Sequence, residues 1–253
     1  MGGNWTNNGS FTPNSHTVTF DGGGTQTLDS GAITFYDLTV NSGSTLVDLA
    51  EFTVDGTLTN NGTLQKTQDV NDSLDVDFFN TGGYGGLTLN ANGTNLGSTQ
   101  VSIKGNQDCT TAGETVKRCF DVSPTITSTR NATITFYFDS SELSGNTCSE
   151  LNIYHWDGSE WDALTLDTSY DTDGRLCGSD PQSVRVKSVS DFSSFVLKSG
   201  DDPNAVTLAR FTARLAGEDL TGFQNLSGLV ALAALGAVGG ALLLRARRRR
   251  SRR

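Results

Sequence analysis

Positive charge is scarce in most of this chain. Lys66 is the sole lysine or arginine among residues 1–103, and the whole sequence has 18 lysines and arginines against 28 aspartates and glutamates. Seven of these cations are arginines of residues 245–253, so residues 1–244 hold 11 cations and 28 acids, a net charge of −17. Such a surface repels nucleic acid and anionic lipid headgroups. We therefore expect no nucleic-acid partner, in spite of the basic C-terminal end.

Proline and helix-forming patterns are scarce as well. There are four prolines, and no long amphipathic helical pattern precedes residue 205, whereas 29 glycines accompany abundant threonine, serine and asparagine. Threonine favours strands, and glycine, asparagine and serine favour tight turns. The composition therefore predicts an all-β fold, with helix confined to the C-terminal end.

The four cysteines show no Cys-x-x-Cys spacing. In an exported chain an even number of cysteines predicts disulfides, here two, with three possible pairings. We favour Cys109–Cys119, which brackets a short excursion typical of one hairpin, together with Cys148–Cys177. Zinc is the competing interpretation, but both histidines of the sequence lie far from any suitable ligand spacing.

An uncharged apolar segment runs from Leu226 to Leu244 and is followed by arginines. As a helix it spans roughly 28 Å, close to the ~30 Å hydrocarbon core of a bilayer. Arginine clusters stay on the cytoplasmic side. The sequence thus predicts a single-pass cell-membrane protein with an extracellular N-terminal part, a cytoplasmic C-terminus and the lipid bilayer as partner. A core helix followed by a basic arm is the alternative, which the absence of a polar face disfavours. The anchor includes Leu226, Leu235, Leu244, Arg245, Arg247 and Arg248.

Residues 1–70 contain an internal echo. WTNNGSF at Trp5–Phe11 recurs as LTNNGTL at Leu58–Leu64, and between them TVTF, ITFYDLTV and FTVDGTL alternate apolar and polar residues. This period of two predicts short strands with one buried face, and Asn-Gly tolerates the positive φ of tight turns. Strands this short, at intervals of about 10 to 20 residues, are typical of β-solenoid coils or of a β-sandwich.

The run from GNWTNNGSFTPNSHTVTF to FTVDGTLTNNGTLQ resembles the repeats of large bacterial cell-surface proteins of the adhesin-like, β-helix kind. The resemblance covers about the first 70 residues and implies a stalk or display surface. The chain also opens without the apolar leader of an exported protein. We therefore expect it to be the C-terminal portion of such a protein, with a truncated or fragmentary N-terminus.

Residues 71–200 differ in character, with longer predicted strands and all four cysteines. In ATITFYF (132–138) one face carries Ile134, Phe136 and Phe138, and HWDGSEW predicts a hairpin turning at Asp157-Gly158. These residues predict an antiparallel β-sandwich. ATITFYFDSSEL, LNIYHWDGSEW and VSDFSSFVL resemble the disulfide-bearing β-sandwich found next to the membrane anchor of bacterial surface proteins.

A spacer is expected over residues 201–225, because the paired acids before Pro203 favour solvent and proline ends a ladder. The end of the chain is similar to C-terminal sorting signals of bacterial envelope proteins, yet neither an LPxTG nor a PEP motif is present. We therefore expect an intact membrane anchor over 226–244 and a cytoplasmic arginine-rich tail over 245–253.

No catalytic constellation stands out, so no enzyme is expected and no cofactor is assigned. Two candidate sites remain. Carboxylates clustered near the DTDG turn form a weak calcium candidate, for which a solvated turn is the alternative: Asp167, Asp171, Asp173 and Asp180. Tyr154, Trp156 and Trp161 flank one hairpin and could contact a glycan, although aromatics facing each other across a hairpin also stabilise the hairpin itself.

The sequence therefore predicts a membrane-anchored surface protein with a structural or adhesive role, displaying β-rich modules outside the cell. Carbohydrate binding through the sandwich is the alternative. A glycan-cleaving β-helix is a more distant one, because hydrolysis needs only two carboxylates in a groove and the first 70 residues contain several.

Overall fold

The computed structural model describes residues 1–110, 114–171, 173–200, 203, 214–215 and 218–219. The chain divides into two compact units, Met1–Ala205 and Val206–Arg253. In the second unit, β20 (Arg214–Leu215) pairs antiparallel with β21 (Glu218–Asp219). The predicted membrane helix over 226–244, the arginine-rich tail and most of the spacer lie outside the described residues. Within the part that is described, no helix is long and apolar enough to cross a membrane.

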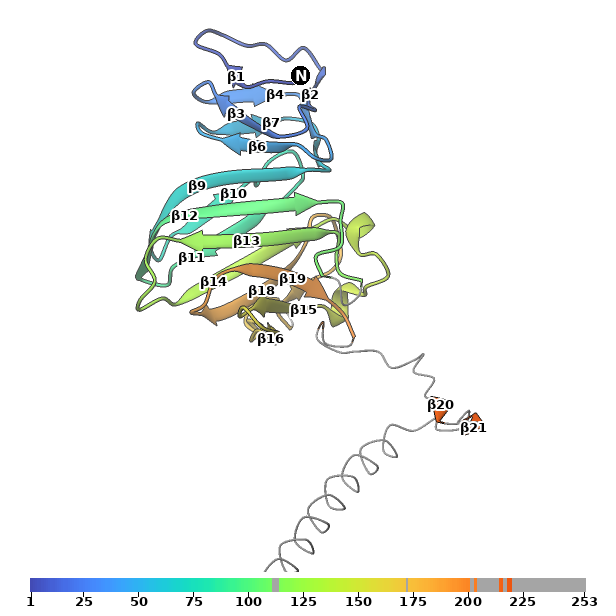
Figure 1. Cartoon of the computed structure of the whole chain (residues 1–253). Helices are drawn as coiled ribbons and strands as arrows, with labels where there is room; N and C mark the ends of the chain where they lie inside the picture. Colours follow the sequence, from blue (N-terminus) through green and yellow to red (C-terminus); the bar gives the residue numbers. More distant parts are fainter. Residues whose placement is uncertain (111–113, 172, 201–202, 204–213, 216–217, 220–253) are drawn as a thin grey trace, which may run out of the picture. The chain divides into compact units, whose positions relative to one another are not determined.

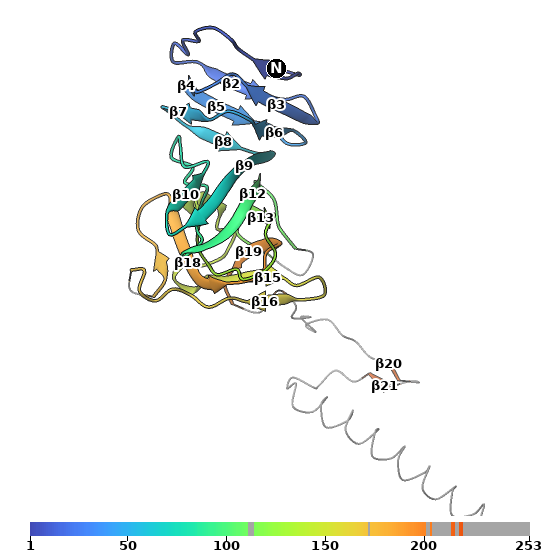
Figure 2. The same cartoon turned by 90° about the vertical axis from the view of Figure 1, so that its left-hand side faces the viewer.

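The first unit begins with short parallel strands stacked in coils (Figures 1 and 2). Each complete coil contributes one strand to each of three sheets, so this segment is β-solenoid-like, as its resemblance implied. The first sheet contains β1 (Trp5–Thr6), β3 (Thr25–Asp29), β6 (Thr45–Asp48) and β9 (Thr63–Asp72). The second contains β2 (Thr17–Phe20), β5 (Asp37–Val40) and β8 (Leu58–Asn60), and the third β4 (Ile33–Phe35) and β7 (Phe52–Val54).

Equivalent positions lie beside one another in successive coils. Thr25 is paired with Thr45, and Thr45 with Thr63, so the repeat is 20 residues and then 18. The Asn-Asn-Gly echo does not follow this repeat, because Trp5 belongs to the first sheet and Leu58 to the second. The two copies therefore occupy different positions of a coil, and the echo reflects shared turn chemistry rather than the structural repeat.

A column of aromatic rings runs through the coils. The ring centroids of neighbouring members are 5.1 to 6.2 Å apart, and the column extends from the N-terminal segment to the loop after β10: Trp5, Phe11, Phe35, Phe52 and Phe79. Phe35, in the middle of the column, is fully buried. Alternation with a period of two places these rings inside while threonines face outward, which gives each short strand one buried face.

The rest of the unit is antiparallel. The sheet that contains β9 continues through β12 (Thr94–Gly105), β13 (Arg118–Pro124), β19 (Ser194–Lys198), β15 (Asn152–Trp156) and β16 (Trp161–Ala163). A second sheet has the order β10 (Asp75–Phe78), β11 (Leu87–Asn90), β14 (Ala132–Phe138), β18 (Gln182–Val189) and β17 (Arg175–Leu176). Two short 3-10 helices, η1 (Ser140–Glu142) and η2 (Cys148–Glu150), follow β14.

The two antiparallel sheets pack face to face. Phe136 of β14 meets Phe120 of β13 at a centroid distance of 5.0 Å and Phe195 of β19 at 5.4 Å, and all three rings are 0 to 1% exposed. Pairs of this geometry add roughly 0.5–1.5 kcal/mol each beyond the burial of their surface. Phe136 is one of the three residues, with Ile134 and Phe138, that the alternation of β14 placed on one face, and all three are buried.

β9 joins the coils to the sandwich. One edge of β9 pairs parallel with β6, and the other pairs antiparallel with β12 (Figure 1). A boundary at residue 70 falls inside this strand. Leu64 in β9 is fully buried, and its direct partners are Leu46 in the coils and Ile103 in the sandwich. The solenoid and the sandwich therefore share one strand and one nine-stranded sheet.

Candidate functional site

A pocket lies where the last coil meets the sandwich. Its volume is about 390 Å³, within the roughly 300–1,000 Å³ typical of small-molecule sites. Its walls come from four places: residues 57–61 around β8, the loop at 82–84, the start of β13 with Asn106 nearby, and residues 139–142 around η1. The glycine at 82 has a φ of 56°, and a Cβ there would lie 2.7 Å from the Leu58 amide nitrogen, so a side chain would separate this loop from the coil.

Arg118 forms one wall of this junction pocket, and its side chain is 2% exposed. Its Nη2 lies 2.7 Å from Glu142 Oε2, and its Nε donates to Glu142 Oε1. Its Nη1 donates to the carbonyl oxygens of Tyr84 and Tyr137, at 2.7 and 3.0 Å. The guanidinium also lies 3.7 Å from the centroid of the Tyr84 ring. A buried arginine is tolerated only when its charge is paired and its donors are satisfied, and this network does both.

Glu142 is held from two sides. Besides Arg118, its Oε2 accepts a hydrogen bond from the Asp139 amide at 2.7 Å, and the Asp139 carboxylate accepts one from the Ser141 amide. These reciprocal bonds form a capping box at the start of η1. Burial raises the pKa of Glu142 above its ordinary value, and the nearby charge of Arg118 acts in the opposite direction.

Asn60 and Tyr84 both line the pocket, and their side chains are hydrogen-bonded to each other. Asn60 Nδ2 donates to the Ile103 carbonyl at 2.9 Å, and Asn60 Oδ1 accepts from the Gly62 amide at 3.1 Å. These two bonds fix the orientation of the amide, because a carbonyl can only accept and an N–H can only donate. Asn60 Nδ2 therefore also donates to the Tyr84 hydroxyl, at 3.0 Å. Tyr84 is 5% exposed.

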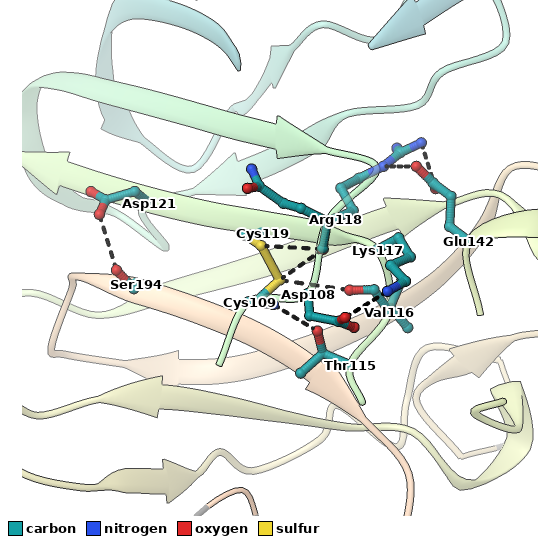
Figure 3. The surroundings of a disulfide bond; sticks show 11 residues. Asp108, Cys109, Thr115, Val116, Lys117, Arg118, Cys119, Asp121, Glu142 and Ser194 are labelled. Carbon is teal, nitrogen blue, oxygen red and sulfur yellow. Dashed lines mark hydrogen bonds and ion pairs between the residues drawn. A yellow bond between two sulfur atoms is a disulfide. The ribbon is translucent and has the colours of Figure 1, made fainter. Parts of the chain in front are cut away.

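The Cys109–Cys119 disulfide lies beside this network. It is formed, as is Cys148–Cys177, so both predicted pairs are confirmed. Figure 3 shows Arg118 directed away from the sulfur atoms toward Glu142, while Lys117 reaches Asp108 at 2.6 Å. Cys119 is the second residue of β13, next to Arg118, so the crosslink ties the start of this strand to Cys109.

The three residues predicted to contact a glycan do not line one common pocket in the structure. Trp156 and Trp161 face each other across the β15–β16 hairpin, with ring centroids 5.3 Å apart. Trp156 lines a pocket of about 340 Å³ together with Arg130, His155, Asp157, Asp162, Asp191 and Ser193, whereas Trp161 lines a smaller one of about 120 Å³. Trp156 and Trp161 thus line two different pockets, whereas Tyr154, at 4% exposure, lies in the interior.

Ser193 and His155 are paired beside Trp156. His155 Nε2 is 3.1 Å from Ser193 Oγ, and that hydroxyl donates to the Trp156 carbonyl. Because the hydroxyl proton points to a carbonyl, the imidazole Nε2 donates and Ser193 accepts. A serine nucleophile would need the reverse arrangement, with the imidazole accepting the proton. Burial lowers the pKa of His155, and the charge of Asp191 acts in the opposite direction.

The four calcium candidates have different partners. Asp167 accepts from Ser169 and lies 3.7 Å from Lys187 Nζ, Asp173 pairs with Arg175 at 2.9 Å, and Asp180 accepts from Ser140. Asp171 is exposed, in a turn with positive φ. Among the residues that the structure describes, no group of three or more histidine, cysteine or acidic side chains could hold a metal ion. The contacts of three of these carboxylates are those of turn and ion-pair residues.

The residues of the junction pocket were missed by the sequence interpretation. A signal existed for one of them. Arg118 shares an alternating face with Phe120 and Val122, both buried, and a charged residue on an inward face needs a partner. Its partners Tyr84, Tyr137 and Glu142 are 19 to 34 positions away in the sequence, and no local pattern marks them.

Comparison with known proteins gives no match. No family model matches the sequence, and no match is found among curated proteins or solved structures. What the chain does must therefore be argued from its own residues and geometry.

Proposed function

We propose that this protein is a structural display module of the cell surface. Residues 226–244 anchor it in the membrane, and the solenoid and the sandwich lie outside the cell. Its role is to hold β-rich surfaces away from the bilayer for structural or adhesive contacts. Two disulfides support an oxidising location, since such bonds persist mainly outside the cytoplasm.

The observation that carries this proposal is the strand shared by the coils and the sandwich. Modules joined by a flexible linker reorient freely. Here β9 is hydrogen-bonded on both edges, and Leu64 packs between Leu46 and Ile103. A display protein benefits from such a junction, because the orientation of its outermost coils is then set by the sandwich.

Surface location is tested by adding proteinase K to intact cells that make the full chain. Digestion of the part before residue 201, detected with an antibody raised against it, and recovery of the chain in the membrane fraction are expected. A Leu235→Arg variant is the matched control. It places a charge at the centre of the apolar segment, at a cost of roughly 2.5–3.5 kcal/mol in insertion, and should reduce membrane retention. Recovery of the unaltered chain in the soluble fraction, or its protection from the protease, would contradict the proposal.

Carbohydrate binding at the hairpin is a second candidate function. It is favoured by Trp156, which is partly exposed and lines a pocket that also contains Arg130 and Asp157. Aromatic side chains with polar groups beside them suit the apolar and hydroxyl faces of a sugar ring. The full chain would be tested on a glycan array beside Trp156→Ala. Tyr36→Ala, which removes an exposed aromatic ring from the coils, is the control. Saturable binding that only Trp156→Ala abolishes supports this function, and equal binding by all three proteins would refute it.

A further inference from the structure

We propose that the junction pocket is a binding site for a saccharide, recognised through its hydroxyl groups and in part by the hydroxyl of Tyr84. This site is separate from the hairpin pocket around Trp156, and the inference does not depend on the membrane anchor or on the display role. It rests on the hydrogen-bonding state of Tyr84, on the neutrality of the pocket and on the chemistry of its walls.

Tyr84 has an unused hydrogen-bond donor at a buried position. The orientation of Asn60 makes the Tyr84 hydroxyl an acceptor of the Asn60 amide proton. No acceptor for the hydroxyl's own proton is found within the described part of the chain. Buried polar groups normally have their donors satisfied, and Tyr84 is 95% buried beside an open pocket of about 390 Å³. A ligand oxygen in the pocket would accept this proton.

The charges in the walls of the pocket balance. The pocket has two cationic and two anionic side chains in its walls, and each is held by a protein group. Arg118 pairs with Glu142, Lys117 pairs with Asp108 at 2.6 Å, and Asp139 accepts from the Ser141 amide. An anion would lack an unpaired cation to bind, and a metal ion would lack convergent free carboxylates. The neutral balance therefore favours an uncharged polar ligand.

The remaining walls of the pocket carry uncharged polar groups. Hydroxyl groups come from Thr57, Thr59 and Ser141, and amides come from Asn61 and Asn106. Hydroxyls both donate and accept, and primary amides do so with separate atoms, which matches the hydroxyl groups of a sugar. One face of the Tyr84 ring is already covered by Arg118. A flat aromatic ligand would lack a stacking surface on that face, so hydrogen bonds would dominate recognition.

The test uses the full chain in detergent and a panel of free oligosaccharides of glucose, galactose, mannose and N-acetylglucosamine, with binding followed by calorimetry. Tyr84→Phe removes the hydroxyl and keeps the ring under Arg118. One hydrogen bond corresponds to roughly 2- to 13-fold in affinity, so weakening in that range is expected. Tyr170→Phe is the matched control, because it also removes a tyrosine hydroxyl with one hydrogen bond, here to Ser183. Its affinity should equal that of the unaltered chain.

Deoxy derivatives of the sugar that binds sharpen the result. If Tyr84 donates to one sugar oxygen, the derivative lacking that oxygen should bind the unaltered chain and Tyr84→Phe with equal affinity. Unchanged melting temperatures of both tyrosine variants would show that the fold is retained. The proposal is overturned if no sugar of the panel binds saturably, if Tyr84→Phe binds as tightly as the unaltered chain, or if binding is lost in Trp156→Ala but not in Tyr84→Phe.

Discussion

Arg118 and Glu142 form a bidentate ion pair at the solenoid–sandwich junction, with Nη2 to Oε2 at 2.7 Å and Nε to Oε1 at 3.1 Å. The arginine is the larger and more deeply buried partner, at 2% side-chain exposure against 16% for the glutamate. Geometry of this kind both strengthens and orients the pair. Removing either charge would leave the other buried without compensation.

Glu142→Gln should therefore destabilise the protein by about 3–5 kcal/mol, the range for breaking a buried pair from one side. Urea unfolding followed by circular dichroism measures the effect. Glu150→Gln in η2 changes the same residue type at an exposed position and should shift stability by less than about 0.5 kcal/mol. Similar effects of the two substitutions would mean that the pair with Arg118 contributes no net stability.

Acid should destabilise the sandwich through His155. Its pKa is lowered by burial, so in the window between the lowered value and the ordinary value of 6.5 the unfolded chain binds the proton more readily. Stability from this group is therefore full above the ordinary pKa and decreases as the pH falls through that window. Melting temperatures of the unaltered chain and of His155→Gln would be compared at pH 5 and 7. A smaller pH dependence is expected for the variant.

His16→Gln is the control for that comparison, because the other histidine of the chain is exposed. Its pH dependence should match that of the unaltered chain. If His155→Gln and the unaltered chain lose stability equally between pH 7 and 5, protonation of His155 is not the cause.

The two disulfides should contribute unequally to stability. Cys148–Cys177 closes a loop with a sequence separation of 29, and Cys109–Cys119 one of 10. Loop-closure entropy gives about 3.6 kcal/mol for the first and about 2.8 kcal/mol for the second. The two double cysteine-to-serine variants would be compared by urea unfolding. A greater loss in the Cys109 and Cys119 variant would show that this crosslink acts mainly on the native junction with Arg118 rather than on the unfolded chain.

The coils and the sandwich should unfold as one unit because β9 belongs to both. Leu64→Ala removes a fully buried side chain from that strand and should cost about 2–5 kcal/mol. Amide exchange followed by mass spectrometry would show β6 and β12 losing protection together in the variant. Separate loss of protection, first in one and then in the other, would mean that the shared strand does not couple them.

The period-two pattern was sufficient to predict most of the strands. ITFYDLTV separates into β4 and β5, and ATITFYF coincides with β14. The Asn-Asn-Gly echo does not mark the structural repeat, because the same turn residues occur at different positions of a coil. The true repeat is carried by buried positions such as Gln26, Leu46 and Leu64, which stack on one another although the first is polar and the other two are apolar.

The disulfide pairs were predictable for a local reason, since each favoured pair joins two consecutive cysteines of the chain. The candidate site was not predictable in this way. Tyr84 lies between β10 and β11 and Arg118 lies in β13, so the two meet only when distant parts of the chain have folded together. Tyr154 and Trp156 lie on the same face of β15, and their different burial follows from their positions along the strand, because Trp156 is its last residue.

The strand β9 also determines where the molecule would yield under mechanical load. A pull along the stack of coils acts across its two hydrogen-bonded edges. The register with β6 covers four positions, Thr63 to Lys66, whereas the register with β12 extends from Thr63 to Asp72. Separation of the strands would therefore begin between β6 and β9. β9 would stay paired with β12 and would cover the edge of that strand, which would otherwise be open to pairing with other chains.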